Sequence, residues 1–143
     1  MNTPLTRPPT ASELLADPGV MQAMDEAWVD SQGNDPDDRH EEGGWIYMDL
    51  ATAAIVTRRA PTGTRSRLFL ANPPLLPNHS IVGTFHTHPH PASEGWATEP
   101  STQDALAARH TGVPRLIRAE DGDHRTGPDS RRGGLGGGAG YPL

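Results

Sequence analysis

The sequence predicts an α/β domain, and three patterns support that fold class. Residues 18–31 place apolar side chains at the spacing of an amphipathic helix. Residues 45–48 and 80–88 are a short apolar run and an alternating run, both typical of strands. Residues 101–110 are rich in alanine and leucine, and a helix-capping pattern opens the segment. A chain of 143 residues fits one domain with a single modest core.

The first long helix is expected to begin after Asp17, with Pro18 at its first position. Its buried stripe is expected to consist of Val20, Met24, Ala27, Trp28 and Ser31. The segment 33–36, Gly-Asn-Asp-Pro, should end it. Before it, residues 1–11 carry three prolines and are expected to be a disordered lead-in, while residues 12–16 form one helical turn.

Strands are expected over residues 45–48, 53–57, 65–70, 80–88 and 113–119. The first two should form a hairpin, and the last should end in a turn at Asp121-Gly122-Asp123. We expect the domain to span residues 12–128, followed by a flexible glycine-rich tail over residues 129–143.

Composition excludes several classes of function. The chain has no cysteine, which rules out disulfides, thiolate zinc sites and a cysteine nucleophile. Its net charge is −6 without a basic stripe, which argues against a nucleic-acid partner. No apolar run approaches the roughly 20 residues of a membrane span, and the N-terminus lacks the apolar core of a signal peptide. We therefore expect a cytoplasmic protein.

The strand over residues 80–88 carries the chemistry. Regular alternation would point Val82, Thr84, His86 and His88 to one face. Asp104 falls in the first turn of the following helix, where the helix dipole favours a carboxylate. Two histidines, one aspartate and an open fourth position describe a catalytic rather than a structural zinc site.

A hydrolytic zinc also needs a carboxylate to accept a proton and a donor for the developing oxyanion. Glu41 or Glu42, just before the first strand, would supply the carboxylate, and Ser101 would be the donor. The remaining histidines show no evident partner and are expected at the surface: His40, His79, His90, His110 and His124.

Taken together, these segments resemble the JAMM motif of the MPN/JAB metalloprotease superfamily, in its prokaryotic branch. The motif consists of a Glu, a later His-x-His-Pro and a later Ser-x-x-Asp. Here they correspond to Glu41 to Gly44, Gly83 to Pro89 and Pro100 to Asp104. The resemblance covers about residues 18–120, and the loop from His88 to Ser101 is a few residues longer than usual.

The resemblance implies a mixed, curved β-sheet flanked by helices, the cytidine-deaminase-like MPN/JAB architecture. It also implies a zinc-dependent peptidase or isopeptidase acting on a protein or peptide, such as a ubiquitin-like or sulfur-carrier protein. His86, His88 and Asp104 would bind Zn²⁺, and Ser101 would stabilise the tetrahedral intermediate. Glu41, three residues before a glycine, would assist attack by zinc-bound water, with Glu42 as the second choice.

Three other interpretations remain. A catalytically silent MPN-type domain would bind proteins without cleaving them. The same two histidines and aspartate match the ligand set of a non-haem iron enzyme. The run His86-Thr87-His88-Pro89-His90 also invites comparison with histidine-triad nucleotide hydrolases, although Thr and Pro stand where apolar residues are expected. Exposed strand edges would permit a homodimer.

Overall fold

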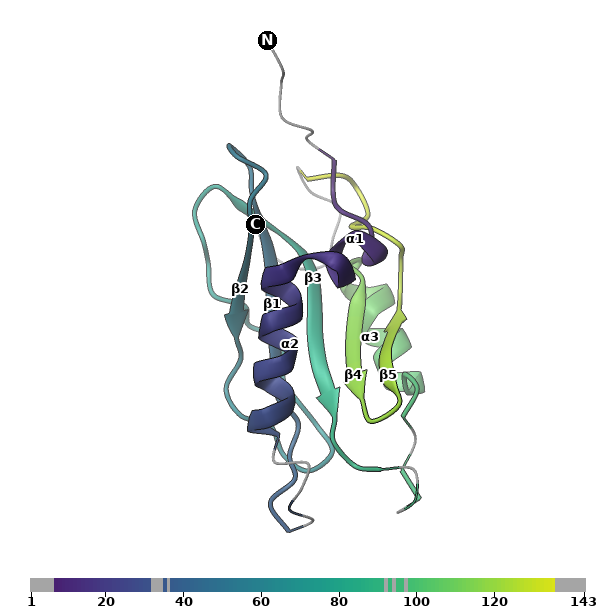
Figure 1. The fold of residues 1–143 in the computed structure, drawn as a ribbon. Coiled ribbons are helices and arrows are strands. Elements are labelled where there is room, and N and C mark those ends of the chain that lie inside the picture. The colour runs from purple at the N-terminus through teal and green to yellow at the C-terminus, as the bar shows by residue number, and fades with distance from the viewer. Residues whose placement is uncertain are drawn as a thin grey trace.

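The computed structural model describes residues 7–31, 35, 37–91, 93, 95–96 and 98–135. Its elements are α1 (Ala11–Ala16), α2 (Pro18–Asp30), β1 (Gly43–Asp49), β2 (Ile55–Arg59), β3 (His79–His88), α3 (Thr102–Thr111), β4 (Arg115–Ala119) and β5 (Gly122–Thr126). Figure 1 shows β3 near the middle of the sheet, with α2 packed across it. None of the helices in the described part of the chain has the length and apolar character that crossing a bilayer requires.

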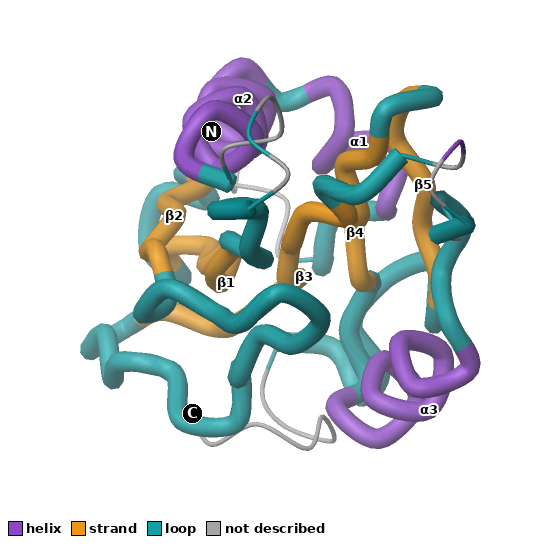
Figure 2. Tube along the Cα trace, turned by 90° about the horizontal axis from the view of Figure 1, so that it is seen from below, coloured by secondary structure: helices purple, strands orange, loops and turns teal. Residues whose placement is uncertain are grey.

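The strands form one mixed sheet in the order β2-β1-β3-β4-β5. Strands β3 and β4 run parallel and are connected through α3, whereas the other neighbours are antiparallel. Figure 2 shows α1 and α2 on one face of the sheet and α3 on the other. The α/β class is therefore confirmed, as a five-stranded mixed sheet flanked by helices.

Each face of the sheet has its own buried cluster. The helix-side core, beneath α1 and α2, consists of Ala11, Leu14, Val20, Ala23, Met24, Ala27, Ile46, Met48, Val82, Phe85 and Leu116. The loop-side core consists of Trp45, Tyr47, Ala60, Leu68, Leu70, Ile81 and Val113. Burial of these side chains supplies the main driving force for folding.

The predicted helix signals are confirmed. Asp17 caps α2, its Oδ1 accepting a hydrogen bond from the Val20 amide at 3.0 Å, and Pro18 is the first helical residue. Ser101 caps α3, and Gly112 ends that helix in the left-handed conformation at φ 73°. A glycine suits this position because it has no Cβ to clash at positive φ.

One prediction about β3 is wrong. The register between β1 and β3 shifts between Ile46 and Tyr47, so Val82 is an extra residue that forms a β-bulge. Val82 therefore lies in the helix-side core with Phe85, on the face opposite His86 and His88.

The predicted strand over residues 65–70 is also wrong. Leu68 and Leu70 are buried and Phe69 is exposed, as expected from the alternating pattern, but the segment pairs with none of the described strands. It covers the loop-side core as a loop, and its Leu70 carbonyl accepts a hydrogen bond from Trp45 Nε1 at 3.1 Å. Conversely, β5 was not predicted, because its sequence Gly-Asp-His-Arg-Thr offers no apolar pattern.

The beginning of the predicted tail contacts the domain. Arg131 is buried, and its Nη1 donates to the Ile81 carbonyl at 2.9 Å. The Asp129 carbonyl accepts a hydrogen bond from the Ala11 amide at 2.7 Å. Residues 136–143 and the first six residues of the predicted lead-in lie outside the described part of the chain.

Candidate metal centre

The carboxyl-terminal half of β3 brings the two histidines together. His86 and His88 point to the same face, and their Nε2 atoms lie 3.2 Å apart. Thr87 points to the opposite face, where its Oγ1 is hydrogen-bonded to Ser31 Oγ at the end of α2. This contact anchors the histidine strand to the helix behind it.

The capping box of α3 delivers the aspartate. Asp104 is the third residue of the helix, and its amide donates to Ser101 Oγ at 3.1 Å, while the Ser101 amide donates to Asp104 Oδ2 at 2.9 Å. The carboxylate is thereby aimed at the strand. Oδ1 lies 3.1 Å from His86 Nε2, and Oδ2 lies 3.2 Å from His88 Nε2.

These separations fit a metal ion. Ligands at about 2.0–2.1 Å from a tetrahedral ion stand about 3.3–3.4 Å from one another. The contacts among His86, His88 and Asp104 span 3.1–3.2 Å. Asp104 makes these contacts through different oxygens, Oδ1 to His86 and Oδ2 to His88, so one of them would have to turn toward the ion. Neutral imidazole and carboxylate are the ligand types that divalent metals accept.

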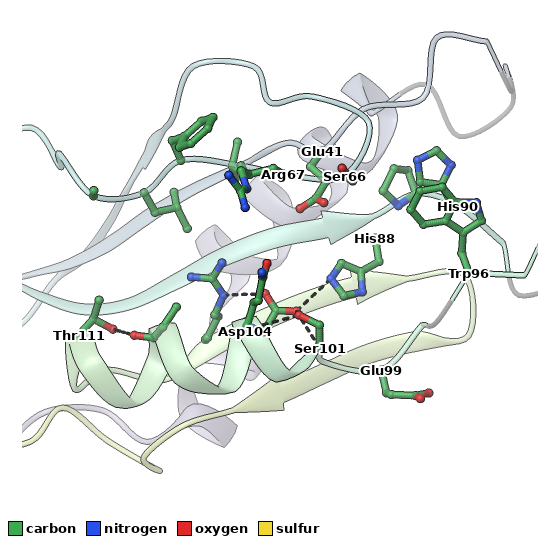
Figure 3. A pocket seen from close by; sticks show the side chains of 18 of the residues that line it. Glu41, Ser66, Arg67, His88, His90, Trp96, Glu99, Ser101, Asp104 and Thr111 are labelled. Atoms are coloured by element: carbon green, nitrogen blue, oxygen red, sulfur yellow. Dashed lines mark hydrogen bonds and ion pairs between the residues drawn. The ribbon is translucent and has the colours of Figure 1, made fainter.

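Glu41 completes the group. Its carboxylate and the ring nitrogens of His86 and His88 lie within 4.8 Å of one another. The main chain of Glu41 is held by the next loop, because its amide donates to the Thr64 carbonyl at 2.8 Å and its carbonyl accepts from the Gly63 amide at 2.9 Å. Figure 3 shows Glu41 on one wall of a cleft, facing His88 and Asp104 on the other side.

Glu42 points elsewhere. Its Oε1 accepts from Arg59 Nη2 at 2.7 Å, and its Oε2 lies 2.7 Å from His40 Nε2. Arg59 also pairs with Asp30 at the end of α2. Glu42 thus belongs to a polar network on the helix side of the sheet, whereas Glu41 faces the candidate metal centre.

Glycine at position 43 allows this arrangement. A Cβ at Gly43 would stand 2.1 Å from the Phe85 carbonyl oxygen and 2.7 Å from His86 Cα. No side chain fits at such distances, so β1 approaches β3 this closely only as glycine. The close approach places Glu41, two residues earlier, beside the histidines.

Electrostatics differ sharply between the four groups. Burial raises the pKa of Glu41 to about 7. Burial also lowers the pKa of His86 to about 4, which favours the neutral, ligand-competent imidazole. For His88, burial is outweighed by hydrogen bonding to Asp104, and the pKa is raised. Burial would raise the pKa of Asp104, but hydrogen bonds from both histidines hold it well below the usual range of a carboxyl.

Ser101 lies beside Asp104, and its hydroxyl already makes a hydrogen bond. The Oγ donates to Asp104 Oδ2 at 3.0 Å, in addition to capping the helix. The serine hydroxyl thus has one proton and currently directs it at the carboxylate. Redirecting that proton to a substrate oxygen would require the hydroxyl to rotate.

A cleft of about 630 Å³ opens over these residues. Four of the predicted residues line it, Glu41, His88, Ser101 and Asp104, whereas His86 is 1% exposed and is not part of the lining. Several other side chains contribute, among them Arg67, Phe69, Trp96 and Arg115. Arg115 Nε donates to Asp104 Oδ1 at 3.1 Å. No spacing rule links an arginine at the start of β4 to the motif, so only the fold shows this contact.

The prediction that the other histidines lie free at the surface is wrong in part. His90 is 3% exposed, its ring stacks on Trp96 at a centroid distance of 3.9 Å, and its Nε2 lies 2.8 Å from the Arg65 carbonyl oxygen. This contact joins the long loop after His88 to the loop that carries Arg67. Three others face carboxylates: His40 next to Glu42, His79 next to Asp49, and His124 next to Asp121.

Compared with protein-family models, with curated proteins and with solved structures, the chain matches none. What can be inferred about function therefore depends on the geometry of the site and on the sequence motifs.

Proposed function

We propose that this protein is a zinc-dependent hydrolase that cleaves a peptide or isopeptide bond, with an MPN/JAB-type arrangement of sheet and helices. The observation that carries the proposal is the convergence of two imidazole nitrogens and a carboxylate at 3.1–3.2 Å, with Glu41 alongside. Soft thiolate ligands are absent, and nitrogen plus oxygen donors in a cleft suit catalytic zinc.

His86, His88 and Asp104 would hold the ion, which when bound would polarise a carbonyl and make water more acidic. Glu41 is the proton acceptor in this scheme. Its pKa of about 7 suits a group that takes a proton from water and later returns it to a leaving amine. It lies on the cleft wall opposite Asp104, in the same cleft that a substrate would enter.

Ser101 and the cleft supply the remaining functions. The serine hydroxyl, beside the ligands, would donate to the oxygen that becomes negatively charged during attack. The cleft walls carry Phe69 and Trp96, which are 65% and 37% exposed, and they offer apolar contacts to a peptide chain. A ubiquitin-like or sulfur-carrier protein of the cytoplasm, presenting an extended tail, is the kind of substrate this cleft would take.

Metal content and turnover test the proposal. Purified wild-type protein should contain about one zinc per chain, and the His86→Ala/His88→Ala variant should contain none. Glu41→Gln should keep the zinc but lose cleavage of a panel of peptides and ubiquitin-like fusions, whereas Glu42→Gln, whose side chain faces Arg59, should remain active. Folded wild-type protein without metal would overturn the proposal, and iron in place of zinc would favour an oxygenase.

One observation favours a second function, a catalytically silent binding module. The Asp104 carboxylate already receives contacts from His86, His88, Arg115 and Ser101, so a metal ion is not needed to satisfy it. In that case zinc would neither copurify nor raise the melting temperature. The metal measurement therefore separates the two candidates.

A further inference from the structure

Arg115 occupies a position that the proposed chemistry leaves unexplained. It opens β4, where it lies opposite Thr84 of β3, and it is 9% exposed. Its Nε donates to Asp104 Oδ1, and its side chain lines the cleft. A buried arginine next to a metal ligand carries a fixed positive charge, because guanidinium does not lose its proton in proteins.

The outer edge of this guanidinium is available to a ligand. Within the described part of the chain, Asp104 is the only hydrogen-bond or ion-pair partner of the Arg115 side chain. Its terminal nitrogens are not sealed from solvent, unlike Nη2 of Arg131, which is buried without a partner. Because Arg115 lines the cleft, its terminal nitrogens can serve as the two donors that bind a carboxylate with parallel hydrogen bonds.

The charges around the cleft favour an anion. The side chains that line it include three carboxylates, Glu41, Glu99 and Asp104, and two guanidinium groups, Arg67 and Arg115. A bound divalent cation would give the cleft a net positive charge with all three carboxylates ionised. Because field lines concentrate in a low-dielectric cleft, an anionic substrate group would be attracted there.

We propose that Arg115 binds the α-carboxylate of a substrate residue directly following the cleaved bond, so that the protein removes a carboxyl-terminal residue. Arg115 Nε is 3.1 Å from Asp104 Oδ1, which is 3.1 Å from His86 Nε2, so the two nitrogens lie no more than 6.2 Å apart. One extended residue spans about 3.3–3.6 Å, and a charge-assisted hydrogen bond adds about 2.8 Å. A separation within this limit can be bridged by one residue, with its carbonyl at the candidate ligands and its carboxylate on the terminal nitrogens of Arg115.

The reaction is a simple hydrolysis. Water adds its hydroxyl to the acyl carbon, the carbon–nitrogen bond breaks, and the amine leaves with the proton, giving a shortened chain and a free amino acid. This inference rests on the proposed function for its chemistry. The recognition of the carboxylate can nevertheless be tested without turnover.

The test measures binding of two probes to zinc-loaded Glu41→Gln protein. The probes are pools of N-acetylated tripeptides, randomised at the last two positions, one pool ending in a free acid and the other in an amide. We expect the acid pool to bind roughly 10- to 100-fold more tightly. Adding Arg115→Lys should keep a positive charge near Asp104 but reduce this preference at least fivefold, because lysine lacks the planar fork.

Arg58→Gln is the matched control, because Arg58 is exposed on β2 and does not line the cleft. It should leave the preference unchanged, and zinc content and melting temperature should confirm that each variant is intact. Equal binding of both pools, binding of neither, or an acid preference that survives in Arg115→Lys would overturn the proposal. If the acid preference depends on Arg115 but wild-type protein cleaves no peptide, the proposed hydrolase function fails while carboxylate recognition stands.

Discussion

At the scale of single residues, two adjacent glutamates have entirely different surroundings. Glu41 faces the candidate metal centre with a pKa of about 7, whereas Glu42 is tied to Arg59 and His40 on the other face. Neighbouring side chains on an extended backbone point in opposite directions. The sequence alone left the choice open, and the ion pairs of Glu42 favour Glu41 as the proton acceptor.

The raised pKa of Glu41 makes a prediction about stability. A carboxyl whose pKa is raised by folding destabilises the folded protein as pH rises from its unfolded value of 4.5 to about 7. In metal-free protein, Glu41→Gln should therefore increase the free energy of unfolding by on the order of 2 kcal/mol more at pH 8 than at pH 5. Denaturant unfolding in the presence of a chelator at both pH values measures this.

Glu42→Gln is the control for that measurement. It breaks a buried pair with Arg59 and should destabilise the protein at both pH values. If Glu41→Gln shows no extra stabilisation at pH 8, the Glu41 carboxyl is more solvated than its surroundings indicate.

At the scale of elements, the capping box of α3 serves both the helix and the candidate metal centre. The box formed by Ser101 and Asp104 starts the helix and aims the carboxylate at His86 and His88. A second box, Thr10 with Glu13, starts α1 far from the cleft. The two capping boxes can therefore be compared, one that includes the candidate ligand Asp104 and one outside the cleft.

Ser101→Ala and Thr10→Ala should each lower the free energy of unfolding by about 1 kcal/mol through loss of the cap. Only Ser101→Ala should also weaken zinc binding, by roughly 10-fold, because it removes a hydrogen bond that orients Asp104. Chemical denaturation and competition with a zinc indicator measure the two effects. Equal zinc affinity in both variants would show that Ser101 has no part in holding the ligand.

Elements with strong local signals could be predicted from the sequence, and those that depend on distant contacts could not. The caps at Asp17 and Ser101 are local, and both were correct. The alternation over residues 65–70 arises from packing on the loop-side core, which mimics a strand without pairing. β5 is held by its ladder with β4 and carries no apolar signal of its own.

In the candidate site, too, some residues could be predicted from local sequence motifs and others only from the fold. His86, His88, Asp104 and Glu41 were predicted from a linear motif, and the fold brings all four together. Arg115 comes into contact with Asp104 only because β4 pairs parallel to β3. Parallel pairing depends on a crossover connection, which no local pattern specifies.

At the scale of the whole molecule, metal binding to the Glu41→Gln variant should be linked to pH through one proton, because this variant lacks the Glu41 carboxyl, whose pKa of about 7 would add a second. His86 has a lowered pKa of about 4 and is already neutral near pH 6, whereas His88 has a raised pKa and must lose a proton to bind metal. The zinc association constant should therefore fall toward tenfold per pH unit below the pKa of His88, with a slope near one rather than two. Indicator competition from pH 5.5 to 8 measures the slope.

His124→Gln is a suitable control, because His124 pairs with Asp121 away from the metal ligands. It should leave the pH dependence unchanged. A flat profile would contradict the assignment of His88 as the titrating ligand, and a slope of two would mean that His86 is also protonated near neutrality.

The bulge at Val82 determines which side of the sheet the chemistry occupies. Without the bulge, regular alternation would place His86 and His88 on the same face as Val82, in the helix-side core. Removing one residue from this strand would force a choice between keeping the core and keeping the histidines in the cleft. The extra residue Val82 thus lets one strand place apolar side chains in the core and histidines in the cleft. Deleting one residue from β3 should therefore lower stability far more than any point substitution within it.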